Sequence, residues 1–284
     1  MKKTMPDIGD IENKNLIIVA PNGARKTKLD HPNLPLSPEE LAVEVENCVA
    51  QGAAMVHLHA RTAQGAHSLE IEDNLAVYHV VKQRLGDKVI IQLTTEAVGI
   101  YNPEQQMDLI KAIEPEAASF ALVELIPTQE SEEIAKQFFH WLTLRNITSQ
   151  YIVYSPEQLS YYLDLRRRGI LPAEQHHLLF VLGRYNENLE SEPSDLDPFL
   201  ELVKQLDGVR WAVCAFGSKE QECLLKAARL GGDVRIGFEN NLYTTEQVVA
   251  DSNASQVRDL VTALNREGGT VMDVETARKN LFSA

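Results

Sequence analysis

AMVHLHAR, at residues 54–61, is an apolar run typical of a buried β-strand that ends in two histidines. On a strand, residues two apart point to the same face with Cα atoms roughly 6.5–7 Å apart, so both imidazoles can converge on one metal ion. Two polar rings side by side in an apolar interior are unfavourable unless something occupies the space between them. We therefore interpret His57 and His59 as metal ligands.

A second stretch, DVRIGFENN at residues 233–241, completes the set. Arg235, Gly237 and Glu239 share one parity and hence one face of a strand. Two histidines and one carboxylate with an open position are typical of a catalytic zinc site, although iron and manganese accept the same ligand types. The lack of cysteine ligands argues against a structural zinc.

Short apolar runs rich in β-branched residues recur along the whole chain, and each is followed by a helical pattern or a helix signal. The predicted strands are 16–20, 55–59, 89–94, 118–122, 151–154, 178–182, 211–216 and 234–238. The predicted helices are 37–51, 75–85, 103–113, 131–144, 156–168, 197–206, 220–229 and 254–265.

The first of these helices opens with Ser37-Pro38-Glu39-Glu40, which is a capping-box sequence with proline at the first position. Eight β-α units without a dividing linker predict a single (β/α)8 TIM barrel over residues 1–284, with residues 1–15 as a polar N-terminal extension. Catalytic residues of such barrels lie at the C-terminal ends of the strands. The eighth strand closes beside the first, so only the first strand separates Glu239 from the two histidines.

Composition limits the kinds of partner. The chain has 27 Lys and Arg against 41 Asp and Glu, a net charge of −14, which disfavours a general nucleic-acid or anionic-membrane surface. No apolar run has the length of a signal peptide or membrane span, so we expect a cytoplasmic protein. The three cysteines, Cys48, Cys214 and Cys223, lack CxxC spacing and fit reduced thiols.

Several segments together resemble the β-keto acid cleavage enzymes over nearly the whole chain. They are 22–24 (NGA), 33–40 (NLPLSPEE), 56–61 (VHLHAR), 91–95 (IQLTT), 180–183 (FVLG), 211–213 (WAV), 235–241 (RIGFENN) and 252–254 (SNA). The resemblance implies a homo-oligomeric barrel, a tetramer or dimer. It also implies a divalent metal, usually zinc, and the condensation of a β-keto acid with acetyl-CoA to give acetoacetate and a new acyl-CoA.

Carried over to this sequence, the resemblance assigns the metal to His57, His59 and Glu239. It gives Arg235 the task of orienting the substrate carboxylate and stabilising the developing oxyanion, for which a guanidinium is well suited. Thr94 and Thr95 would contact the substrate through their hydroxyls.

The sequence also departs from the family pattern in its acid-base residues. The position after the metal-binding glutamate is commonly aspartate, but here it is Asn240, which can orient a substrate and cannot act as a general base. Family members commonly have a glycine-rich turn after the third strand and an arginine-containing loop after the seventh, where this chain has Glu96-Ala97-Val98-Gly99 and Gly217-Ser218-Lys219-Glu220. Glu96 is a candidate replacement base, because it follows the third strand near the mouth of the barrel.

A further departure reverses the charge near the barrel mouth. Family members commonly carry an acid where this chain has Arg25, which is followed by Lys26 and Lys28. We hypothesise that these cations select a β-keto acid with a second anionic group rather than an amine. They could instead bind the phosphates of CoA, together with Arg184 or Lys219.

Three alternatives stay open at this point. A metal-dependent hydrolase or class II aldolase would use the same ligands on the same barrel without CoA. Asn240 also fits a catalytically inactive barrel that binds metal and ligand. In a purely structural barrel the histidines would be packing residues.

Overall fold

Eight parallel strands form a closed barrel in the computed structural model, which describes residues 14–173, 176–186, 188–203 and 209–282. The predicted (β/α)8 barrel is confirmed. In order around the ring the strands are β2 (Ile17–Val19), β3 (Met55–Leu58), β6 (Ile90–Thr94), β7 (Ala117–Ala121), β8 (Thr148–Val153), β9 (His177–Leu182), β10 (Arg210–Ala215) and β11 (Asp233–Ile236). The pairing of β11 with β2 closes the ring.

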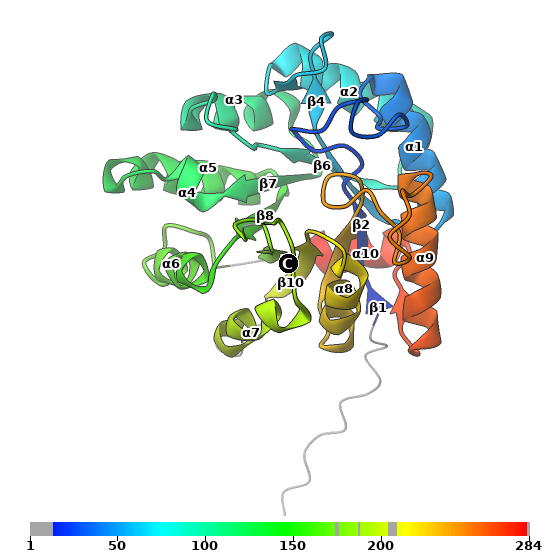
Figure 1. The fold of residues 1–284 in the computed structure, drawn as a ribbon. Helices are drawn as coiled ribbons and strands as arrows, with labels where there is room; N and C mark the ends of the chain where they lie inside the picture. Colours follow the sequence, from blue (N-terminus) through cyan, green and yellow to red (C-terminus); the bar gives the residue numbers. More distant parts are fainter. Residues whose placement is uncertain (1–13, 174–175, 187, 204–208, 283–284) are drawn as a thin grey trace, which may run out of the picture.

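The helices surround this ring on its outer side (Figure 1). Those that follow the strands are α1 (Pro38–Ala50), α2 (Ile71–Leu85), α3 (Pro103–Ile113), α5 (Glu132–Leu144), α6 (Pro156–Arg167), α7 (Asp197–Val203), α8 (Glu220–Arg229) and α9 (Asn253–Arg266). The capping box predicted before α1 is present, because Ser37 Oγ accepts from Glu40 N–H while the Glu40 carboxylate accepts from Ser37 N–H.

The structure also contains smaller elements that the sequence patterns did not indicate. They are β1 (Lys14–Asn15), which pairs with β12 (Thr270–Val271), the hairpin of β4 (Ala60–Arg61) and β5 (His67–Ser68), α4 (Leu122–Leu125), η1 (Gln129–Ser131), η2 (Pro193–Leu196) and α10 (Val274–Phe282). α10 packs under the N-terminal end of the barrel, where Arg278 donates to the carbonyls of Asp87 and Val89 just before β6. It therefore closes the end of the barrel opposite the candidate site.

Some element boundaries differ from the predicted ones. β8 begins at Thr148, three residues before the predicted start, because the polar residues 148–150 continue the strand. α2 begins at Ile71, one turn earlier than predicted. The predicted helix 197–206 is described only to Val203, and of the predicted N-terminal extension only Lys14 and Asn15 lie within the described residues.

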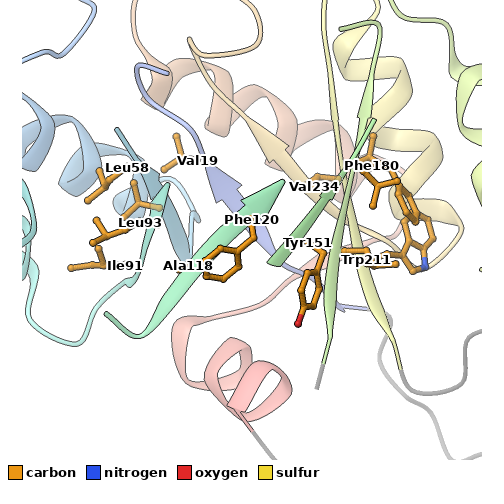
Figure 2. Close-up of a cluster of buried hydrophobic side chains, with 14 of the residues drawn as sticks. Val19, Leu58, Ile91, Leu93, Ala118, Phe120, Tyr151, Phe180, Trp211 and Val234 are labelled. Carbon is orange, nitrogen blue, oxygen red and sulfur yellow. The ribbon is translucent and has the colours of Figure 1, made fainter. Parts of the chain in front are cut away.

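Two apolar layers hold the barrel. The outward side chains of the strands pack with the helices in one cluster, to which Phe120, Tyr151, Phe180 and Trp211 contribute large aromatic rings from four successive strands (Figure 2). A smaller cluster fills the lower interior and joins α10. None of the described helices combines the length and apolar character that a bilayer span requires.

The Ser37 cap gives a direct test of how local sequence stabilises this fold. We expect Ser37→Ala to lower the free energy of unfolding by about 1 kcal/mol, because the N–H of Glu40 loses its acceptor. The measurement is urea denaturation followed by circular dichroism. Ser131→Ala is the matched control, since Ser131 precedes α5 without a side-chain cap hydrogen bond; equal losses in both variants would contradict the prediction.

Candidate active site

His57, His59 and Glu239 meet at the C-terminal end of the barrel. His57 lies in β3, His59 follows that strand, and Glu239 follows β11, which only β2 separates from β3. The Nε2 atoms of the two histidines are 3.0 Å apart, and Glu239 Oε2 lies 3.6 Å from His57 Nε2 and 3.4 Å from His59 Nε2. The barrel thus brings together the three residues that the sequence patterns singled out.

The dimensions of this triangle fit a metal ion. Ligand distances of about 2.0–2.1 Å in a tetrahedral zinc site place neighbouring ligand atoms about 3.3 Å apart. The three separations in this protein bracket that value, so the three atoms can occupy three corners of one tetrahedron. Among the described residues, these three form a group that could hold a metal ion.

The hydrogen-bond state of the ligand atoms supports the same fit. Glu239 Oε2, one corner of the triangle, is buried and has no hydrogen-bond partner among the described residues, which is unfavourable in a closed polar cluster. Burial lowers the pKa of His57 to about 3, so its ring is neutral and its nitrogen can donate a lone pair. Burial raises the pKa of Glu239, but Arg235 and the two histidines outweigh this and bring it well below its ordinary value.

Two glycines shape the loops around Glu239. Gly237 has φ +140°, and a Cβ atom there would lie 2.4 Å from the carbonyl oxygen of Ala20, so only glycine lets the chain turn against β2. Gly23 has φ +63°, and a Cβ atom there would lie 2.5 Å from Glu239 Cγ. The loops after β2 and β11 are therefore packed directly against the carboxylate.

Arg61 connects the loop after β2 with the strand pair β4 and β5 through hydrogen bonds. Its buried guanidinium donates to the carbonyl oxygens of Gly23, Lys26 and Gly65. No sequence pattern assigned this arginine a role, although it stands two residues after His59. Its function in the structure is to fix the backbone beside Glu239.

Arg235 lies in β11 with only 3% of its surface exposed. Its Nη2 donates to Glu239 Oε1 at 2.9 Å and contacts Cys214 Sγ at 3.4 Å, while its Nε has no partner among the described residues. The guanidinium therefore holds the glutamate carboxylate at the wall of the barrel interior.

A cavity of about 400 Å³ opens above these residues. Its charged lining consists of four cationic and three anionic side chains, which are Arg25, Lys26, Arg184, Arg235, Glu96, Glu190 and Glu239. His57, Thr94 and Asn240 also line it. In an acidic protein this cavity is thus locally cationic.

The predicted cations differ in their surroundings. Arg25 is exposed and lies 3.6 Å from Glu96. Lys26 is partly buried, donates to the carbonyl oxygen of Glu239 at 2.6 Å, and has its pKa lowered chiefly by desolvation. The guanidinium of Arg184 lies 5.5 Å from the centre of the Phe216 ring, at the edge of the cavity.

The candidate acid-base residues also differ. Both side-chain polar atoms of Asn240 are buried without a hydrogen-bond partner among the described residues. Glu96 lines the same cavity, with Oε2 3.9 Å from His59 Nδ1. Its backbone N–H donates to Thr94 Oγ1, which orients that threonine.

Two of the predicted site residues lie elsewhere. Thr95 donates its hydroxyl proton to the carbonyl oxygen of Ser119 and does not line the cavity, because it has the opposite parity to Thr94. Lys219 does not line it either, since its ammonium group binds Glu192 at 2.5 Å. The structure therefore gives no support to a ligand-binding role for either residue.

Sequence reasoning missed other polar residues near the site. Tyr154 lines the cavity, and His67 is buried with its ring 5.2 Å from that of His59. Glu220 is buried behind Asn241, whose side chain donates to it, and burial raises its pKa to about 8. No spacing pattern marks these residues, because the barrel brings them together from separate segments.

Comparison with known proteins places these features in context. The 3-keto-5-aminohexanoate cleavage enzyme of Fusobacterium nucleatum is 26% identical over 275 residues, which cover 94% of this chain and 97% of that protein. The 3-oxoadipate:acetyl-CoA acetyltransferase of Cupriavidus necator is 23% identical over 271 residues, which cover 93% of each chain.

Among solved structures, the ternary complex of ObcA with C4-CoA adduct and oxalate superposes with a TM-score of 0.71 at 18% identity. The match covers 88% of this chain and 67% of that chain, and it shows a shared fold. A family model for beta-keto acid cleavage enzyme matches residues 14–282, which is nearly the whole of the described barrel. The chain therefore belongs to the β-keto acid cleavage enzyme family.

Proposed function

We propose that this protein is a metal-dependent acyltransferase that cleaves a β-keto acid with acetyl-CoA, giving acetoacetate and a new acyl-CoA. The observation that carries the proposal is the His57, His59 and Glu239 triangle, which lies beside Arg235 at the cationic cavity. Family membership and relatives named for acetyl-CoA-dependent transfer support the same reaction.

The products determine what the site must do. Acetoacetate retains the carboxylate and the adjacent CH₂ carbon of the substrate, so this carbon must bond to the acetyl carbonyl and separate from its own keto carbon. The acyl group that is left takes the sulfur of CoA. The CH₂ carbon must lose a proton before it can attack and regain one when the bond to its keto carbon breaks, so the reaction needs a group near that carbon that accepts and then returns the proton.

A divalent ion held by the three ligands would polarise the keto oxygen and so acidify the neighbouring CH₂ group. Arg235, which lines the cavity beside Glu239, would orient the substrate carboxylate through its guanidinium. Thr94 would contact the substrate from β6, and Asn240, which also lines the cavity, would orient it.

Glu96 is our candidate for the base. Of the three glutamates in the cavity, Glu239 faces the metal position and Glu190 accepts from the backbone and hydroxyl of Ser218. The carboxylate of Glu96 lines the cavity. Asn240 lines it too, but an amide cannot accept a proton as an aspartate carboxylate would. Arg25 Nη2 lies 3.6 Å from Glu96 Oε1, at the mouth of the same cavity.

We infer further that the β-keto acid carries a second anionic group. Arg25, Lys26 and Arg184 line the cavity, and the formal charge of the lining is positive even before a metal is counted. The relatives include proteins named for a dicarboxylic substrate and for an amino substrate at similar identity, so the local charge is the stronger guide. The same cations are near enough to the mouth to receive the phosphates of acetyl-CoA.

We propose zinc as the metal, because two imidazoles and one carboxylate with an open position are its usual catalytic ligand set. A cytoplasmic location fits the three cysteines, which are all free and buried. A homo-oligomer, as a tetramer or dimer, is proposed from the family resemblance.

Metal analysis tests the ligand set. We expect about one zinc ion per chain in the purified protein, and loss of that ion in His57→Ala and Glu239→Gln, since each removes one of three protein ligands. The measurement is elemental analysis after dialysis. His79→Ala removes an exposed histidine of α2 as the control, and zinc retained in His57→Ala would refute the assignment.

Turnover of Glu96→Gln tests the base. We expect kcat to fall by about 10²–10⁴-fold, because the amide cannot accept a proton, while zinc content stays unchanged. Glu190→Gln is the control at the same cavity, since its amide oxygen can still accept from Ser218. A kcat of Glu96→Gln equal to that of the unmodified protein would exclude Glu96 as the base. If the unmodified protein bound the β-keto acid tightly without turnover, the alternative of a catalytically inactive binding barrel would be favoured.

Substrate comparison tests the second anionic group. We expect a dicarboxylic β-keto acid to have a kcat/KM about tenfold or more above that of an amino β-keto acid, as one charge-assisted contact would provide. Arg184→Gln should remove most of this preference. Lys28→Gln is the matched control, because Lys28 pairs with Glu40 and does not line the cavity; preference for the amine would contradict the inference.

A further inference from the structure

A chain of polar side chains runs through the barrel interior from one end to the other. It consists of His57 on β3, Gln92 on β6, Gln150 on β8, His177 on β9 and Asp233 on β11, all with 1% or less of their surface exposed. Interiors of such barrels are usually filled with branched apolar residues. Five buried polar groups in one line therefore require an explanation.

Each member contacts the next. His57 Nδ1 lies 2.7 Å from Gln92 Oε1, and Gln92 Nε2 donates to Gln150 Oε1 at 3.2 Å. Gln150 Nε2 lies 3.0 Å from His177 Nδ1. His177 Nε2 lies 3.3 Å from Asp233 Oδ2, an electrostatic contact that does not meet hydrogen-bond geometry, so this nitrogen has no hydrogen-bond partner among the described residues and faces the carboxylate. The chain ends at Arg210, which donates to both carboxylate oxygens of Asp233.

The last acceptor decides the direction of the whole chain. A glutamine amide can be turned end over end, so Gln92 and Gln150 alone allow either direction of hydrogen bonding. An ionised carboxylate only accepts, which places a proton on His177 Nε2 and leaves His177 Nδ1 to accept from Gln150. Each amide then has one satisfied orientation, and His57 must carry its proton on Nδ1.

The opposite direction is unfavourable on electrostatic grounds. It would set a lone pair of neutral His177 against the Asp233 carboxylate, or it would require a doubly protonated His177. Arg210 already neutralises Asp233, so a second buried cation would lack a counter-charge. Burial raises the pKa of Asp233, but His177 and Arg210 outweigh it and lower the pKa overall, so the group remains an acceptor.

We propose that Asp233, through His177, Gln150 and Gln92, is a remote positioning group that fixes the His57 tautomer with Nε2 free for the metal. Metal-bound histidines commonly donate their other ring N–H to a carboxylate directly. In this protein the carboxylate of Asp233 lies at the opposite end of the barrel, and His177, Gln150 and Gln92 connect it to the His57 N–H. The proposal rests on the proposed metal site, yet the tautomer can be observed without metal.

The first measurement determines which ring nitrogen of His57 carries the proton. Two-bond ¹H–¹⁵N correlation spectra of metal-free, ¹⁵N-histidine-labelled protein identify the protonated ring nitrogen, and the His57→Gln variant assigns the signals. We expect the proton on Nδ1 in the unmodified protein. A His57 ring protonated on Nε2 alone would overturn the proposal, whether or not any variant folds.

Variants at the middle of the chain test its continuity. Gln150→Met removes the acceptor of Gln92 Nε2, so we expect a mixture of His57 tautomers. Gln150→Glu should retain the Nδ1 proton, because its carboxylate still accepts from Gln92. Ser119→Ala, on neighbouring β7, removes a buried hydroxyl without a partner among the described residues and is the control; an equal change there would overturn the proposal.

Metal affinity is the second readout. Competition with a chromogenic zinc chelator should show about tenfold weaker binding in Gln150→Met, at the lower end of the effect of outer-sphere partners, and near-normal binding in Gln150→Glu. Unchanged tautomer and affinity in Gln150→Met would refute the positioning role. An Nδ1 tautomer that depends on Gln150 in a protein that binds no zinc would support the chain and refute the proposed metal chemistry.

Discussion

Closure of the parallel barrel is the constraint on which the site depends. Hydrogen bonds between β11 and β2 place Arg235 opposite Ile18, and Ile18 is in turn opposite Met55 at the start of β3. This register sets the ends of β11 and β3 at the same height, so Glu239 reaches the two histidines across a single intervening strand. An open sheet with the same strands would leave the carboxylate and the histidines at opposite edges.

Burial then gives these residues their chemical character. The imidazole of His57 is neutral because it is enclosed, and Glu239 stays ionised because Arg235 compensates for its enclosure. The same low-polarity surroundings make each unpaired polar atom unfavourable. The polar groups from His57 to Asp233 accordingly lie within 2.7–3.3 Å of one another from strand to strand. Packing and electrostatics therefore act through the same residues.

The site separates into two parts that the sequence treats differently. The ligand triangle and Arg235 have the residues that the family resemblance implies, whereas the cavity above them carries Asn240, Glu96 and Arg25 in place of the commonest family residues. Glu96 and Arg25 lie next to each other, so the two changes compensate in charge. These departures from the family pattern are thus confined to the cavity, and the His57, His59 and Glu239 group is unaffected by them.

The sequence by itself determined the eight-unit barrel and the His57, His59 and Glu239 set, because strand parity and helix caps are local properties that the chain carries wherever it folds. It did not reveal that β8 starts with three polar residues, since Gln150 and its neighbours lack the apolar signal of a strand. Only the tertiary structure decided that Thr95 and Lys219 lie off the cavity, that Arg61 fixes the loop after β2, and that Asp233 connects to His57. These relations join segments far apart in the chain, and their geometry exists only once the barrel has closed.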